Sequence, residues 1–101
     1  MEASLLGVST YEDSTEGMIQ CLADSGLAIY GSKSCPACVN LVKSLGGMEL
    51  VDPIYLECSE EIQKCNEEKM TNYVPEIQIN GELFEGKRTL ENFAKETGCN
   101  T

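Results

Sequence analysis

The sequence predicts an α/β domain built on a mixed four-stranded sheet flanked by helices, with an extra helix at the N-terminus. An apolar run at 27–31 and a second run at 52–58 enclose a helical stretch, and such a β-α-β unit requires a right-handed parallel crossover. Farther along, Asn80-Gly81 lies between alternating apolar and polar residues, a pattern typical of a two-residue hairpin. The hairpin adds an antiparallel pair, so the sheet should contain both strand orientations.

Two helices are expected around the first strand. Asp13 and Glu16 have the spacing of a capping box, which would open a helix that ends at Gly26. After the first strand, apolar residues recur with helical spacing as far as Gly46-Gly47, where the second helix should end. The first of these helices lies outside the β-α-β unit and is therefore the extra one.

Two more helices are expected in the second half of the chain. The stretch SEEIQKCNEEKM is charged, and Ser59 is its expected N-cap. Thr89 should cap the last helix, whose apolar face has the spacing i, i+3, i+4, i+7, and Gly98 should end it. The chain thus divides into an N-terminal leader and helix over 1–26 and an α/β region over 27–101, within a single globular domain overall.

Length and charge limit the classes of function. The 101 residues fit one domain. Seventeen acidic residues against seven basic ones give a net charge of −10, which disfavours nucleic acid as a partner because phosphates would be repelled. No apolar run approaches the ~20 residues that span a bilayer, and the N-terminus lacks the features of a secretory signal. We expect a cytoplasmic monomer without membrane insertion, whose negative surface either stays solvated or steers basic partners.

The stretch YGSKSCPACVN places Cys35 and Cys38 three positions apart, a spacing used for zinc binding, structural disulfides and electron transfer. Cys35 follows a predicted strand, and Pro36 favours the first position of a helix, so the Cys35 sulfur should face unpaired backbone N–H groups. Those donors and the helix dipole stabilise a thiolate. Cys38 lies one turn farther on, close enough to attack a mixed disulfide at Cys35. The pattern favours a redox site.

Zinc is the main alternative for this cysteine pair. A structural four-cysteine site needs a second pair at matching short spacing. The candidates are Cys58 and Cys65, which are separated by six residues, and the chain has no histidine. No metal is therefore expected, while a zinc-binding module and a redox-inactive protein-interaction module remain the alternative functions. Of the other cysteines, Cys21 should be a small buried apolar residue and Cys99 an exposed thiol.

Three segments, YGSKSCPAC, YVPEIQING and GKRTLENFAKETG, in this order and spacing, resemble the thioredoxin superfamily, nearer to glutaredoxins than to large thioredoxins. IYLEC, a later cysteine, and a proline followed by INGELFEG resemble the thioredoxin-like domain fused to bacterial vitamin K epoxide reductase homologues. The similarity covers about residues 27–98. It implies a thioredoxin-like fold and a thiol–disulfide oxidoreductase that exchanges its Cys35–Cys38 pair with protein or small-thiol disulfides, in electron transport and redox homeostasis.

The resemblance also implies further site residues. Val74-Pro75 should be a cis peptide bond facing the active site, where the Val74 backbone pairs with a bound chain or glutathione. Lys33 and Pro36 would join the substrate-binding residues. No cofactor is implied; glutathione is a candidate co-substrate, and glutathione or a donor of the thioredoxin-reductase type would recycle the site.

Two points stay open in the sequence. In the reductase-fused domain, cysteines near Cys58 and Cys65 suggest a second disulfide, but a cysteine well inside a helix can lie beyond the ~7 Å Cα separation that a disulfide spans. Glu57 is either a proton acceptor for Cys38 or an exposed glutamate at a strand end. Tyr30 is expected to be a packed strand residue.

Overall fold

The computed structural model describes residues 17–99, and their fold is built around a mixed four-stranded sheet with the strand order β3-β2-β4-β5. The central strand β2 (Leu27–Gly31) pairs in parallel with β3 (Tyr55–Glu57) and antiparallel with β4 (Glu76–Ile79). The hairpin partner of β4 is the short edge strand β5 (Glu82–Leu83). The predicted α/β class and mixed sheet are confirmed.

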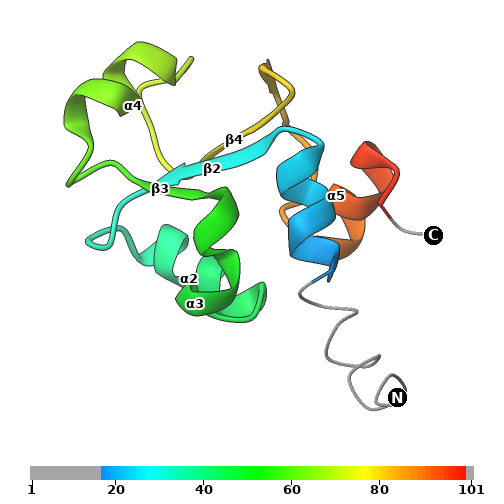
Figure 1. The fold of residues 1–101 in the computed structure, drawn as a ribbon. Coiled ribbons are helices and arrows are strands. Elements are labelled where there is room, and N and C mark those ends of the chain that lie inside the picture. Colours follow the sequence, from blue (N-terminus) through cyan, green and yellow to red (C-terminus); the bar gives the residue numbers. More distant parts are fainter. Residues whose placement is uncertain (1–16, 100–101) are drawn as a thin grey trace, which may run out of the picture.

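Helices cover both faces of this sheet. In chain order they are a helix over 17–24, α2 (Pro36–Ser44), α3 (Met48–Val51), the 3-10 turn η1 (Asp52–Ile54), α4 (Ile62–Glu68) and α5 (Leu90–Thr97). Figure 1 shows α4 on one side of the sheet and α2 with α3 on the other. Within the described part of the chain, no helix is long and apolar enough to cross a bilayer.

The predicted helix and turn signals are met at most positions. Asn80 and Gly81 have φ angles of 54° and 84°, the left-handed conformation that a two-residue hairpin needs. The Thr89 hydroxyl accepts a hydrogen bond from the Asn92 N–H at 3.1 Å and so caps α5, which ends at Gly98. The expected capping box at Asp13 and Glu16 lies outside the described residues.

Two local predictions were wrong. Ser59 does not cap α4, which begins after Glu61; the Ser59 hydroxyl donates to the Glu57 carboxylate instead. The second strand is shorter than the predicted 52–58, because Pro53 lies in the 3-10 turn before it. The helix α3 has only four residues, too few to show a helical period in the sequence.

The two faces of the sheet bury different kinds of side chain, apolar on one face and polar on the other, because successive side chains of a strand point to opposite faces. Ile29 and Ile77 are paired across β2 and β4 and belong to the apolar core formed with α2, α5 and the helix over 17–24. On the other face, Tyr30, Glu76 and Gln78 are also buried, beneath α4. The sheet thus has one apolar and one polar buried face.

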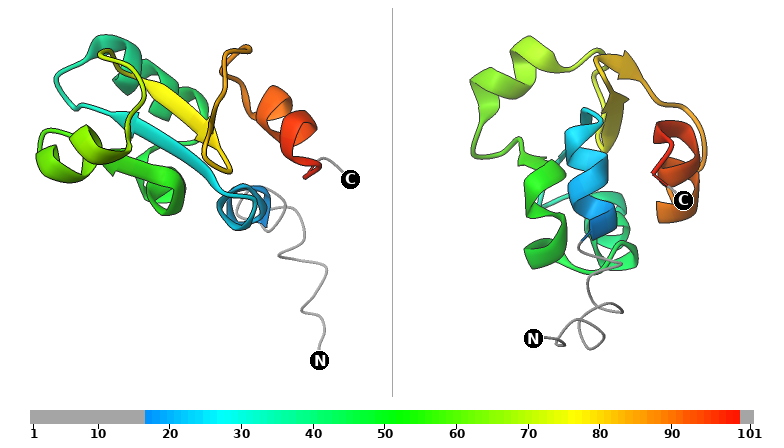
Figure 2. Two further views of the ribbon diagram at one scale, coloured as in Figure 1. Left: turned by 90° about the horizontal axis from the view of Figure 1, so that it is seen from above. Right: turned by 45° about the vertical axis from the view of Figure 1, so that its right-hand side comes forward.

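A disulfide between Cys21 and Cys99 joins the two ends of the described chain, with a Cα–Cα distance of 6.0 Å across 78 residues of sequence. The helix over 17–24 and α5 lie close together at the same end of the sheet (Figures 1 and 2). Cys21, expected to be a small buried apolar residue, is partly buried against the apolar core. The expectation of an exposed Cys99 was wrong, because Cys99 is buried and bonded to Cys21. Sequence spacing carries no sign of this contact, because packing of helices from opposite ends of the chain creates it.

Candidate redox site

Cys35 lies at the end of the loop that connects β2 to α2. It is the N-cap of α2, in an extended conformation, and Pro36 occupies the first turn as predicted. Its side chain is partly exposed and its sulfur is not in a disulfide. The Cys35 Sγ donates to the carbonyl oxygen of Val74 at 3.8 Å. The nucleophile candidate therefore sits between the start of a helix and the loop that enters β4.

The surroundings of Cys35 favour its thiolate. Hydrogen bonds from the Cys38 thiol and from the backbone N–H groups of Cys38 and Ala37 lower the pKa of Cys35. These backbone donors belong to the first turn of α2, where they have no partner within the helix. The physical cause is the one expected from the sequence, with one addition: the largest contribution comes from the second cysteine's side chain.

Cys38 has the opposite environment. Only 1% of its surface is exposed. Burial, together with the neighbouring Cys35 and the Glu57 carboxylate, raises the pKa of Cys38 to about 11, although the Ser32 N–H acts in the other direction. Cys35 and Cys38 are the two cysteines outside disulfides, so the pair is a dithiol whose members differ strongly in acidity.

The Val74-Pro75 peptide bond is cis, as the resemblance implied. Pro75 itself is buried, and beside it lies a surface cavity of about 230 Å³ whose lining includes Tyr73, Phe84 and Arg88. The cavity and the Cys35–Val74 contact flank the same loop. Contact of this loop with a bound chain or a small thiol remains a prediction.

Lys33 and Pro36, the other expected substrate-binding residues, are both exposed. The Lys33 N–H donates to Glu57 at 2.9 Å, and its Nζ pairs with Glu60 at 3.3 Å. The structure thus brings Pro36 to Cys35 but directs the Lys33 side chain toward the β3–α4 connection. A role of either residue in substrate binding remains a prediction.

Sequence reasoning did not identify Tyr55 as part of this site. A Cβ atom added to Gly31 would come within 2.8 Å of the Tyr55 Oη and 3.1 Å of the Cys38 Sγ, so both atoms crowd the same glycine. The Tyr55 hydroxyl donates to Glu57 at 3.1 Å. Its pKa is raised by burial and by Glu57 and the two cysteines, so it stays a neutral donor. The only signal in the sequence is Gly31, at the strand end before the cysteines.

Glu57 is half-buried rather than an exposed strand end. Burial alone would raise its pKa, but hydrogen bonds from the Ser59 hydroxyl, the Lys33 N–H and the Tyr55 hydroxyl lower it. A carboxylate with a lowered pKa is a weak base and an unsuitable proton acceptor for a thiol whose pKa is about 11. The geometry instead gives Glu57 an electrostatic effect on Cys38.

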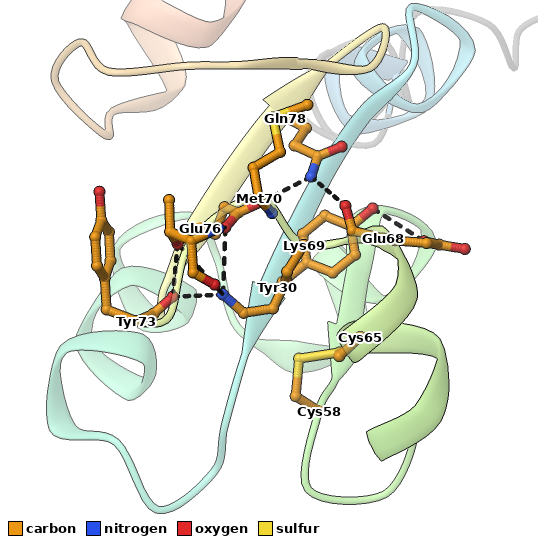
Figure 3. A network of polar contacts seen from close by, with 10 residues as sticks. Tyr30, Cys58, Cys65, Glu68, Lys69, Met70, Tyr73, Glu76 and Gln78 are labelled. Atoms are coloured by element: carbon orange, nitrogen blue, oxygen red, sulfur yellow. Dashed lines mark hydrogen bonds and ion pairs between the residues drawn. A yellow bond between two sulfur atoms is a disulfide. The ribbon is translucent and has the colours of Figure 1, made fainter.

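The loop that enters Pro75 is held by a buried carboxylate, shown in Figure 3. Glu76 is 1% exposed and accepts hydrogen bonds from the Met70 N–H, the Thr71 N–H and hydroxyl, and the Gln78 amide. Lys69 Nζ pairs with it at 3.2 Å and also donates to the Tyr73 carbonyl oxygen. One side chain thereby fixes residues 69–73, directly before Val74.

Cys58 and Cys65 form a disulfide beside this network, with a Cα–Cα distance of 5.6 Å, so the pairing left open by the sequence is present (Figure 3). Cys65 is the middle residue of α4 and lies within reach of the end of β3. The same helix places Glu68 to accept a hydrogen bond from the Tyr30 hydroxyl at 3.0 Å. The disulfide therefore joins α4 to the end of β3, and the hydrogen bond joins it to β2, the strand that precedes the redox pair.

A four-cysteine zinc site would need Cys58 and Cys65 beside Cys35 and Cys38, but the first two are bonded to each other. Among residues 17–99, no group of three or more His, Cys, Asp or Glu side chains is placed to hold a metal ion.

Comparison with known proteins gives no relative for this chain. No protein-family model matches it, and no curated protein matches it.

Proposed function

We propose that this protein is a thiol–disulfide oxidoreductase with a thioredoxin-like, glutaredoxin-like fold, which uses Cys35 and Cys38. The observation that carries the proposal is the unequal pair: a partly exposed Cys35 with a lowered pKa, next to a buried Cys38 with a raised one. The thiolate is the nucleophile in disulfide exchange, so the two sulfurs are suited to different steps. The resemblance of the cysteine, proline and hairpin segments to the thioredoxin superfamily supports the same class.

The reaction divides into two exchanges. The Cys35 thiolate attacks one sulfur of a substrate disulfide, forms a mixed disulfide and releases the other substrate sulfur as a thiolate. Cys38 then loses its proton and attacks the Cys35 sulfur, which releases the second substrate thiolate. The substrate gains two electrons and the protein is left with a Cys35–Cys38 disulfide; the reverse sequence oxidises a substrate dithiol.

The charge on Cys35 controls when Cys38 can ionise for the second step. That charge is one of the causes of the raised pKa of Cys38. When Cys35 enters the mixed disulfide its negative charge disappears, so the pKa of Cys38 falls when this thiol must attack. The thiolate released from the substrate in the first step, with an ordinary pKa of about 8.5, can accept the Cys38 proton.

Protein disulfides or glutathione disulfide are the proposed substrates, without a bound cofactor. The Val74 carbonyl and the cavity beside Pro75 would contact the residues around the substrate sulfur. Arg88 lines this cavity together with Glu76 and Glu85, and it is the cation of this lining that would meet a substrate carboxylate. Recycling by glutathione or by a donor of the thioredoxin-reductase type, and action as a monomer, complete the proposal.

The proposed cytoplasmic location meets one opposing observation. Two disulfides, Cys21–Cys99 and Cys58–Cys65, lie outside the dithiol. Such bonds persist mainly in oxidising compartments. Counting the free thiols of the protein taken from intact cells, quenched in acid, decides between the two: six free thiols indicate a reducing compartment and two or none an oxidising one.

Paired serine variants test the proposed function. Cys38→Ser should still attack a disulfide but stall, and accumulate a mixed disulfide that mass spectrometry detects after incubation with glutathione disulfide. Cys35→Ser should form no such adduct at Cys38 at neutral pH, because that thiol is buried and protonated. Adduct on neither variant, with slow alkylation of both thiols in the unmodified protein, would leave a redox-inactive interaction module as the better description.

A further inference from the structure

A second cavity, of about 260 Å³, includes Cys38 in its lining. It is lined by parts of α2, α3 and the edge strand β3, and Figure 1 shows α2 and α3 on the same side of the sheet. Apart from two lysines, its lining residues are Cys38, Val39, Val42, Gly47, Met48 and Tyr55. Almost all of the surface that they present is apolar, which is typical of a small-molecule site.

This cavity is separate from the proposed substrate groove. Neither Cys35 nor Val74 nor Pro75 lines it. Met48, which lines the cavity, is 44% exposed. A molecule bound here would cover Met48 and lie beside Cys38, while Cys35 stayed open to solvent.

Charge around the cavity selects one kind of ligand. Lys33 and Lys43 line it and no carboxylate does, although the chain has 17 acidic residues and only 7 basic ones. The neighbouring hollow shares Lys33, Met48 and Tyr55 with this cavity and is also lined by Asp52 and three glutamates. The Lys33 ammonium already pairs with Glu60 there. An anion is therefore repelled from that side and drawn toward Lys43.

We propose that this cavity binds a small organic anion with an apolar, flat or branched body and one carboxylate or sulfonate group. The body would pack against Val42, Met48 and Tyr55, and the acidic group would meet Lys43. Because Cys38 lines the cavity, the bound apolar body would replace the water beside it and make its ionisation harder still, since an apolar environment disfavours the charged form. Binding would thus slow the second exchange step and leave the first unchanged. This effect on exchange rests on the proposed function, whereas the binding of the anion does not depend on it.

The probe for this site is naphthalene-2-sulfonate, with the uncharged naphthalene-2-sulfonamide as its matched analogue. Titration of the reduced full chain, followed by the backbone amide signals in NMR, should move the signals of Val39, Val42, Met48 and Tyr55. Lys43→Gln should weaken sulfonate binding about two- to fivefold, the range of one exposed charge contact, and leave sulfonamide binding unchanged. Lys95→Gln, the same change on the exposed face of α5, should alter neither.

Three outcomes would overturn the proposal. Signals that move mainly around Tyr73 and Phe84 would place the probe in the other groove. Equal affinities for the sulfonate and the sulfonamide would remove the anion from the argument. Signals near Met48 that depend on protein concentration without the probe would show that a second copy of the chain covers the cavity.

Rate measurements with the probe bound test the effect of this site separately from the proposed oxidoreductase function. At saturating naphthalene-2-sulfonate, alkylation of Cys35 should keep its rate, while release of a substrate thiol from the preformed mixed disulfide should slow severalfold. If the amide signals respond but no mixed disulfide ever forms, the cavity stands and the oxidoreductase proposal fails. If exchange proceeds and both steps ignore the probe, the claimed effect on Cys38 is wrong.

Discussion

Glu76 should make the stability of this protein strongly dependent on pH in the acid range. Burial by itself would raise the pKa of this carboxyl, but hydrogen bonds from Thr71, Gln78 and the Met70 N–H lower it from the ordinary 4.5 to about 2. A depression of that size corresponds to about 3 kcal/mol of folding free energy, at ~1.4 kcal/mol per pKa unit. The folded state holds the charged form more tightly than the unfolded state does.

The sign of the effect follows from that difference. Above pH 4.5 the carboxylate is charged in both states, and its full contribution of about 3 kcal/mol is present. As the pH falls from 4.5 to about 2, the unfolded state takes up the proton first, so this contribution is lost over that interval. Glu76→Gln removes the charge and leaves Lys69 without its buried partner, which costs about 3 kcal/mol at neutral pH.

Urea unfolding of both proteins between pH 7 and pH 2 measures this prediction. The two free energies of unfolding should differ by about 3 kcal/mol at pH 7 and converge toward pH 2. Glu82→Gln, at an exposed position of β5, is the matched control and should follow the unmodified protein throughout. Parallel curves for the unmodified protein and Glu76→Gln across this range would refute the reasoning.

Three other perturbations give distinct results. Replacing Cys21 and Cys99 together by alanine should lower the free energy of unfolding by about 4 kcal/mol, since the bond closes a loop spanning 78 residues; urea unfolding with and without reductant checks this. Gly31→Ala should impair disulfide turnover, because its Cβ would press on the Cys38 sulfur. In a chain whose Cys35 is replaced by serine, Glu57→Gln should shift Cys38 alkylation to lower pH; an unchanged profile, or an equal shift with Glu60→Gln, would contradict the electrostatic role.

Local signals in the sequence were sufficient for the features that depend on neighbouring residues. Pro36 set the start of α2 and so the position of Cys35, Asn80-Gly81 set the hairpin, and Thr89 set the start of α5. Each of these depends on backbone conformation or capping within a few residues. The cysteine pair and its unequal environments could therefore be anticipated from the sequence.

The features that were missed depend on contacts between distant segments. Gln78 alternates with isoleucines, and this local pattern does not reveal that α4 covers its face of the sheet and buries it. Tyr55 reaches Cys38 only because β3 lies parallel to β2, with Tyr55 opposite Ile29. Cys21 and Cys99 meet because helices from the two ends of the chain pack together. No local pattern encodes these distances.

The contrast between the two buried faces of the sheet sets how each face can change over evolution. Apolar contacts such as those of Ile29 and Ile77 have no fixed direction, so exchange among aliphatic side chains of similar volume is tolerated. The polar face has no such freedom, because Glu76 and Gln78 need donors and acceptors at set positions and angles. The side that carries α4 should therefore change only through coupled substitutions, while the side that carries α2 drifts one residue at a time.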